Sequence, residues 1–270
     1  MADDRGHPQP ARSARPLSLA PSYAVLCAVQ AALVFASRPP ARRGRLSIAG
    51  VAIPVIALVV GVVLIRTTGA HVLAWTGAVA TPVLAAAGRR RLPVAAVLWL
   101  VAWRADGLVA QGASVALIAL AAVTVAQLVA RVAPDWSIAI GLVVVAAVDV
   151  VLVWATHQVQ PASTALHAAS LPSIPRLQDA TFGSATMGWL DLAAPALLGM
   201  VARTRLRAAA ATGIAAGAWG LLLTVTSTVP ATVPVVAGLA LSGADRGLLR
   251  RARESRRARS GARGDRRRPA

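Results

Sequence analysis

Long apolar runs separated by short polar, arginine-rich segments dominate the pattern of this chain. The runs recur from residue 18 to residue 243. A helix rises about 1.5 Å per residue, so a run of about 20 residues can cross the roughly 30 Å hydrocarbon core of a bilayer. The pattern predicts an all-α polytopic membrane protein with about nine transmembrane helices. The expected spans are 18–37, 47–65, 70–88, 92–103, 108–130, 136–155, 184–202, 208–226 and 229–243.

Two of these runs have a second interpretation. Residues 18–37 resemble the apolar part of a signal peptide. A retained span with a stop-transfer cluster is favoured, because four arginines follow the run: Arg38, Arg42, Arg43 and Arg45. Residues 92–103 are short for a span and fit a re-entrant hairpin as well.

The arginine clusters favour nine spans over eight. With nine, the clusters at 42–45, 89–91 and 203–207 and the basic tail at 244–270 all fall on one side of the membrane. The positive-inside rule then places the N-terminus outside and the C-terminus in the cytoplasm. We expect a multi-pass protein of a bacterial-type plasma membrane, with the long loop 156–183 extracytoplasmic.

Composition supports the membrane assignment, because 57% of the 270 residues are hydrophobic. The formal net charge of +18 does not predict nucleic-acid binding, since the arginines lie between or after the apolar runs. We expect residues 1–17 and 244–270 to be disordered tails. The C-terminal arginines either hold anionic lipid headgroups or serve only as a topology anchor. The scattered histidines and single cysteine predict no metal site and no cofactor.

Two of the ten acidic residues, Asp149 and Asp191, lie deep within apolar runs. A carboxylate near the bilayer centre is costly, so its presence there suggests a function. With the orientation above, both are expected roughly 10 Å below the outer surface, on consecutive spans. Two facing carboxyl groups in such a site share a proton and titrate as a unit. Such a pair suits aspartyl proteolysis, a proton or cation relay, or simple hydrogen bonding between helices.

Three segments carry a family resemblance. The stretch from Met187 to Gly199 contains G-W-L-D followed by a proline and small residues, Val148–Val153 begins with V-D, and Val229–Pro234 reads V-P-A-T-V-P. In order and spacing they resemble the Y-D, G-x-G-D and P-A-L motifs of the presenilin and signal peptide peptidase family. The resemblance covers residues 136–243. Three positions depart from the motifs: Val148, Leu190 and Thr232 stand where the family has tyrosine, glycine and leucine.

This resemblance implies an intramembrane aspartyl protease-like protein that hydrolyses peptide bonds in transmembrane helices, with a catalytic-like core at 136–243. Asp149 and Asp191 would be catalytic, and the expected partners are membrane lipids and transmembrane helical peptides. The alternatives are a proton-coupled transporter or channel that uses the same acidic pair, and a catalytically inactive scaffold.

The same resemblance implies a set of residues beside the acids that bind the unwound substrate. The prolines would also free backbone carbonyls, and Gly188 would let helices approach closely. Each of these residues has an ordinary structural interpretation too, as a helix kink or small-residue packing. The set comprises Gly188, Pro230, Ala231, Thr232 and Pro234.

Overall fold

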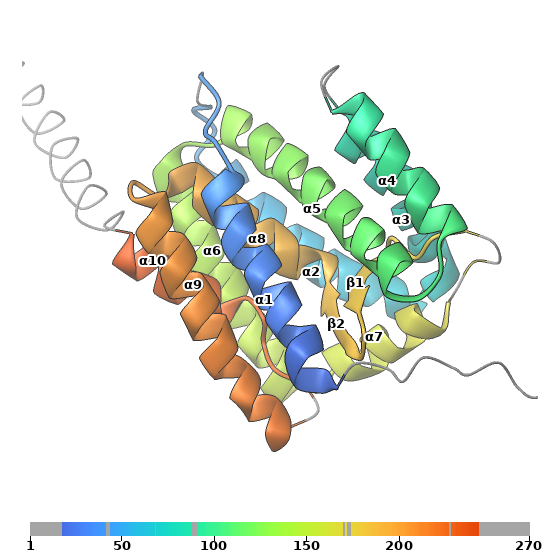
Figure 1. Cartoon of the computed structure of the whole chain (residues 1–270). Coiled ribbons are helices and arrows are strands. Elements are labelled where there is room, and N and C mark those ends of the chain that lie inside the picture. Colours follow the sequence, from blue (N-terminus) through green and yellow to red (C-terminus); the bar gives the residue numbers. More distant parts are fainter. Residues whose placement is uncertain are drawn as a thin grey trace, which may run out of the picture.

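The computed structural model describes residues 18–41, 44–67, 69–87, 91–169, 171, 174–226 and 228–242. Both predicted tails, 1–17 and 244–270, lie outside the described residues, as do several arginines of the clusters at 42–45 and 89–91. The described part of the chain is mostly helical (Figure 1).

Helices form where the sequence predicts apolar spans, because Ala- and Leu-rich runs favour helix and bury well against one another. Residues Val151–Ala155 continue α6 as a π-helix, and Leu221–Thr224 continue α9 as a 3-10 turn. The α-helices are α1 (Leu19–Ala36), α2 (Ala49–Thr67), α3 (Ala70–Ala86), α4 (Leu92–Arg104), α5 (Gly107–Val132), α6 (Asp135–Val150), α7 (Val159–Ala168), α8 (Trp189–Val201), α9 (Arg205–Gly220) and α10 (Val233–Leu241).

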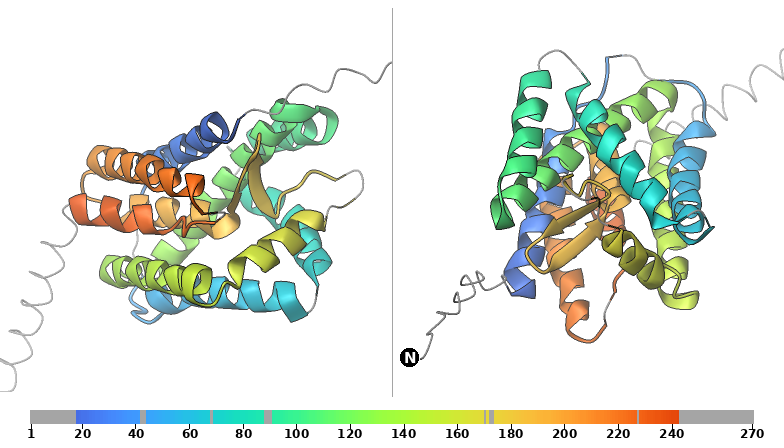
Figure 2. Two further views of the ribbon diagram at one scale, coloured as in Figure 1. Left: turned by 90° about the horizontal axis from the view of Figure 1, so that it is seen from below. Right: turned by 90° about the vertical axis from the view of Figure 1, so that its right-hand side faces the viewer.

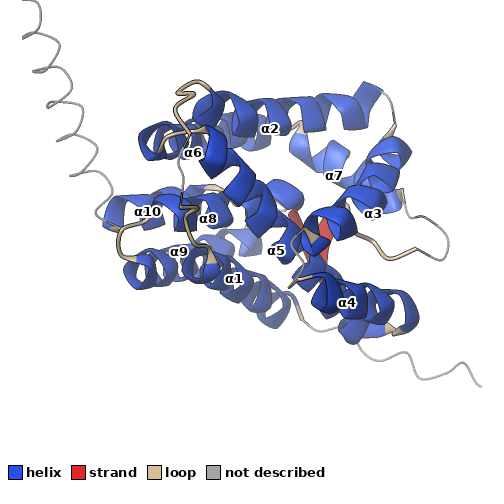
Figure 3. Cartoon of the chain, turned by 90° about the horizontal axis from the view of Figure 1, so that it is seen from above, coloured by secondary structure: helices blue, strands red, loops and turns tan. Residues whose placement is uncertain are grey.

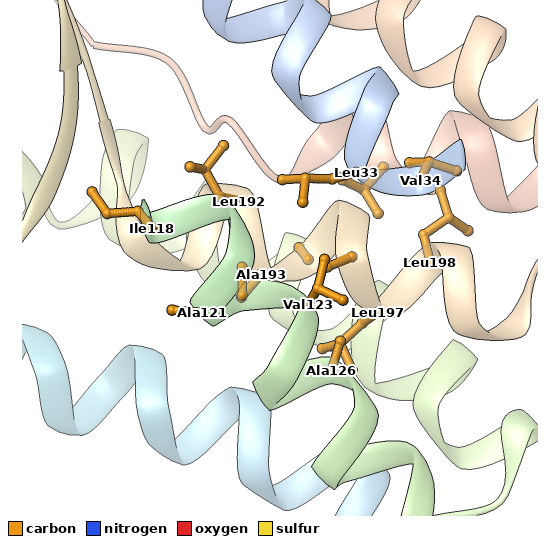
Figure 4. Packing of buried hydrophobic residues seen from close by; sticks show 14 of the residues in the cluster. Leu33, Val34, Ile118, Ala121, Val123, Ala126, Leu192, Ala193, Leu197 and Leu198 are labelled. Atoms are coloured by element: carbon orange, nitrogen blue, oxygen red, sulfur yellow. The ribbon is translucent and has the colours of Figure 1, made fainter. Parts of the chain in front are cut away.

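Helix α8 occupies the middle of the bundle, and every residue from Leu192 to Val201 is buried. It packs against α1, α5, α6, α9 and α10 (Figure 3). Figure 4 shows how α8 is held between two helices from the N-terminal half: Leu33 and Val34 of α1 approach it from one side, and Ile118 and Val123 of α5 from another. The core around the candidate acids is therefore not confined to residues 136–243.

A β-hairpin replaces the beginning of the predicted span 184–202, and that prediction is wrong for its first five residues. Strands β1 (Asp179–Phe182) and β2 (Ala185–Gly188) pair antiparallel, facing the viewer in the right view of Figure 2. Gly183 opens the two-residue turn with φ +60°, a value that glycine adopts without strain. Apart from this one hairpin, the described elements are helical, which agrees with the all-α prediction.

Two further elements differ from the predicted spans. The helix expected over 229–243 begins only at Val233, because Pro234 lies in its first turn, where a missing N–H costs nothing. Residues 92–103 form one continuous helix, α4, and no re-entrant hairpin. Its 13 residues extend about 20 Å.

The outer surface of the bundle is rich in large apolar side chains. Phe35, Ile56, Val83, Val97 and Ile214, from five different helices, are all exposed. A soluble monomer rarely exposes apolar surface on this scale, whereas a lipid-facing surface requires it. Within the described residues, four helical stretches are long and apolar enough to cross a membrane: Leu19–Ala36, Gly107–Val132, Asp135–Ala155 and Arg205–Thr224. These features are those of a helical membrane protein.

Candidate functional site

Asp149 lies one residue before the C-terminal end of α6 and is only 6% exposed. Its carboxyl oxygen Oδ2 accepts a hydrogen bond from the Thr232 hydroxyl at 2.7 Å and a longer one from the Thr232 backbone N–H at 3.4 Å. The chain separation is 83 residues. The motif-like segments around Asp149 and Thr232 therefore meet in space, as expected of a shared site.

Asp191 is the third residue of α8, so it lies in the first helical turn and not about two turns into a helix as the predicted span 184–202 implies. The hairpin is the reason, since it uses the residues that the sequence pattern assigns to the helix start. The Asp191 carboxyl oxygen Oδ2 accepts a hydrogen bond from the backbone N–H of Gly188 at 2.8 Å. The side chain thus caps its own helix, and an anionic group there interacts favourably with the helix dipole.

The two carboxyl groups are close enough to interact electrostatically. Each uses its Oδ2 atom for the bonds just described, and each Oδ1 has no hydrogen-bond partner among the described residues. Neither carboxyl is paired with an arginine or histidine in that part of the chain. Each acid therefore keeps one carboxyl oxygen that a water molecule or a carbonyl group could contact.

The predicted substrate-binding residues divide into two places. Pro230, Ala231 and Thr232 form the non-helical approach to α10, with Ala231 half-buried and the other two buried. Trp219 of α9 fixes this approach, because its indole N–H donates to the Pro230 carbonyl at 2.9 Å. Pro234 lies in the first turn of α10 and does not kink the helix.

Gly188 belongs to the other side of the site, beside Asp191. A Cβ on Gly188 would approach the Asp191 carboxyl oxygen to 3.3 Å, so a side chain here would crowd the acid. In the hairpin Gly188 pairs with Asp179, which is 4% exposed. The His167 ring nitrogen Nδ1 lies 3.2 Å from the Asp179 carboxyl, and Arg176 lies 3.3 Å from His167 Nε2. These polar contacts hold the base of the hairpin.

Sequence analysis missed the contribution of α1. Gln30 is 1% exposed, and its Nε2 donates to the Asp191 backbone carbonyl at 3.0 Å. Tyr23 lies near enough to Asp191 to interact with it electrostatically. Both are polar residues within an apolar run, which was the available signal, but their partner is 161 residues away from Gln30. The described residues contain no group of three His, Cys, Asp or Glu side chains that could hold a metal ion.

Comparison of the chain with protein-family models, curated proteins and solved structures finds no match. The composition, the apolar outer surface and the helical bundle define the class as a helical membrane protein.

Proposed function

We propose that this chain is an intramembrane aspartyl protease-like protein, with Asp149 and Asp191 as its catalytic pair. The observation that carries the proposal is that two carboxyl groups on the packed helices α6 and α8, neither paired with a basic side chain among the described residues, lie near enough for their charges to interact. The V-P-A-T-V-P segment adds support, because it reaches Asp149 through Thr232. The segments around Asp149 and Asp191 and the V-P-A-T-V-P segment are the three that resemble the presenilin and signal peptide peptidase motifs.

The proposed chemistry is hydrolysis of a peptide bond. One carboxylate removes a proton from a water molecule, whose oxygen adds to the peptide carbonyl carbon, while the other carboxyl protonates the carbonyl oxygen. Collapse of the tetrahedral intermediate breaks the C–N bond, and the amine leaves with a proton returned by the acids. The products are a carboxylic acid and an amine, and the acidic pair is regenerated.

The substrate proposed for this pair is a transmembrane helix that has locally unwound, since intact helices conceal their peptide bonds in internal hydrogen bonds. We place the chain in a bacterial-type plasma membrane with nine spans, the N-terminus outside and the C-terminus in the cytoplasm. In this arrangement Asp149 and Asp191 lie toward the outer side, and the apolar exposed side chains face lipid.

The deciding experiment uses the purified full chain in proteoliposomes with a fluorogenic transmembrane peptide. We expect Asp149→Asn and Asp191→Asn each to reduce turnover by at least about a thousandfold, since each removes one member of an acid–base pair. Asp106→Asn is the control, because Asp106 lies at the N-terminal end of α5. Unchanged cleavage in either site variant would refute the proposal. Proton-driven solute flux that needs both acids, without cleavage, would instead identify a transporter.

A further inference from the structure

Before the last turn of α8, the backbone carbonyl of Asp191 lacks its helical partner. In an α-helix the carbonyl of residue i accepts from the N–H of residue i+4. For Asp191 that residue is Pro195, which has no N–H and lies inside the helix. The proline ring also crowds the carbonyl four residues before it and pushes it away from the helix axis. The main chain of a candidate catalytic residue is therefore left without its normal restraint.

Gln30 supplies the missing donor from α1. Its Nε2 atom lies 3.0 Å from the Asp191 carbonyl oxygen. The backbones of α1 and α8 approach closely near this bond. A Cβ at Gly199 of α8 would collide with the backbone carbonyl of Val34. Leu33, Val34 and Leu198 fill the space around this crossing (Figure 4). Such packing fixes α1 at the depth at which Gln30 reaches Asp191.

The other amide atom of Gln30 shows that the residue is not there for packing. Its Oε1 is buried and has no hydrogen-bond partner among the described residues. A buried, unsatisfied amide oxygen destabilises the fold, and methionine would fill the same volume without that cost. What glutamine offers at this position is the bond to the Asp191 carbonyl.

We propose that Gln30 is a positioning residue for Asp191: it replaces the helical hydrogen bond that Pro195 removes and so holds Asp191 against Asp149. This inference rests on the proposed protease function. Asp191 is then fixed twice, through its carboxyl group by Gly188 and through its carbonyl by Gln30. Small displacements of catalytic groups lower turnover strongly.

A double-mutant cycle tests this role. Gln30→Met is expected to lower kcat about tenfold or more and to change KM less than about twofold, because geometry is lost and substrate binding is not. Pro195→Ala restores an N–H to the helix, so Gln30→Met in a Pro195→Ala background should cost less than about threefold. Gln127→Met, the same substitution at a half-buried position of α5, is the matched control. Equal losses from Gln30→Met in both backgrounds would overturn the proposal.

A second measurement does not depend on activity. Cys27→Ala, Asp149→Cys and Asp191→Cys are combined in one chain, and a short bifunctional thiol reagent reports how closely positions 149 and 191 approach. Gln30→Met should slow the cross-link about threefold or more, and Pro195→Ala should restore it. An unchanged rate would overturn the positioning role. Failure of the protease proposal is seen separately, as unchanged cleavage by Asp149→Asn and Asp191→Asn.

Discussion

At the scale of single residues, Thr232 shows how a departure from a motif acquires a role. It stands where the resembled family has leucine, and its hydroxyl donates to Asp149 at 2.7 Å. A leucine cannot make this bond. The sequence predicts that Thr232 binds substrate. In the structure its side chain is instead hydrogen-bonded to Asp149, and Asp149 is only 6% exposed.

Thr232→Val removes the hydroxyl with little change in volume. A hydrogen bond to a buried carboxyl contributes about 1–3 kcal/mol, so we expect kcat to fall about 5- to 150-fold. Thr232→Ser keeps the donor and should stay within about threefold of the parent chain. The measurement is turnover of the fluorogenic peptide, with the melting temperature in detergent recorded for each variant. Equal activity of the valine and serine variants would contradict this role.

Part of the site was readable from residues and part was not. The two acids were predictable because carboxyl groups are rare and costly in apolar runs. The Asp191 carbonyl that lacks a helical donor was also predictable, because Pro195 follows Asp191 by four positions. Gln30 was not, because a side chain that bonds to backbone leaves no complementary residue in the sequence. The link from Trp219 to the Pro230 carbonyl escaped prediction for the same reason.

At the scale of elements, the hairpin before α8 is fixed at its turn by two helices. The Gly183 N–H donates to Gln111 Oε1 of α5 at 2.7 Å, and the Ser184 N–H donates to the Ser22 hydroxyl oxygen of α1 at 3.2 Å. Strand β2 ends at Gly188, which is the N-cap of α8 and lies three residues before Asp191. Held at its turn, the hairpin fixes the point at which α8 begins.

Gln111→Met should loosen the hairpin without unfolding the bundle. The Gly183 N–H loses its acceptor, so we expect amide hydrogen exchange at the paired residues Phe182 and Ala185 to speed up about tenfold. Exchange in the middle of α8 should stay unchanged. Gln127→Met is again the control, and equal exchange in the two variants would show that Gln111 does not hold the turn.

The length of the apolar run predicts a helix where the hairpin forms. Residues 184–202 pass as one apolar segment, and a helix is the natural prediction for it. The contrary signal was short: Thr181 and Phe182, then Gly-Ser, then Ala185 and Thr186, which is the pattern of strand residues around a two-residue turn. The other apolar runs contain no such glycine turn flanked by Thr and Phe, and there the helices form close to the predicted positions.

At the scale of the whole molecule, the distribution of side chains is that of a bundle in lipid. Small residues such as Ala121, Ala122 and Ala126 are fully buried, whereas Val83 and Ile214 are exposed. Without a hydrophobic difference between lipid and core, close packing of small residues holds helices together. Composition alone therefore predicts the class of protein, but not which helices are neighbours.

The proposed orientation is tested by cysteine labelling in a Cys27→Ala chain. Thr164 lies exposed on α7, within the loop assigned to the outside, and Arg203 lies exposed between α8 and α9. We expect Thr164→Cys to react with a membrane-impermeant maleimide in intact cells, and Arg203→Cys to react only after permeabilisation. The reverse result would invert the topology and place Asp149 and Asp191 toward the cytoplasm.

The π-helical segment Val151–Ala155 has a consequence for how this chain tolerates change. The Thr156 N–H bonds to the Val151 carbonyl at 3.0 Å, which is five residues back instead of four. A wide turn of this kind holds a supernumerary residue that an α-helix would not need. If Leu152 is deleted, the backbone can form α-helical hydrogen bonds between residues four apart. Asp149 before the deletion and Trp154 after it then keep their orientations. Length variation beside this acid is thus absorbed locally and not passed on to its neighbours.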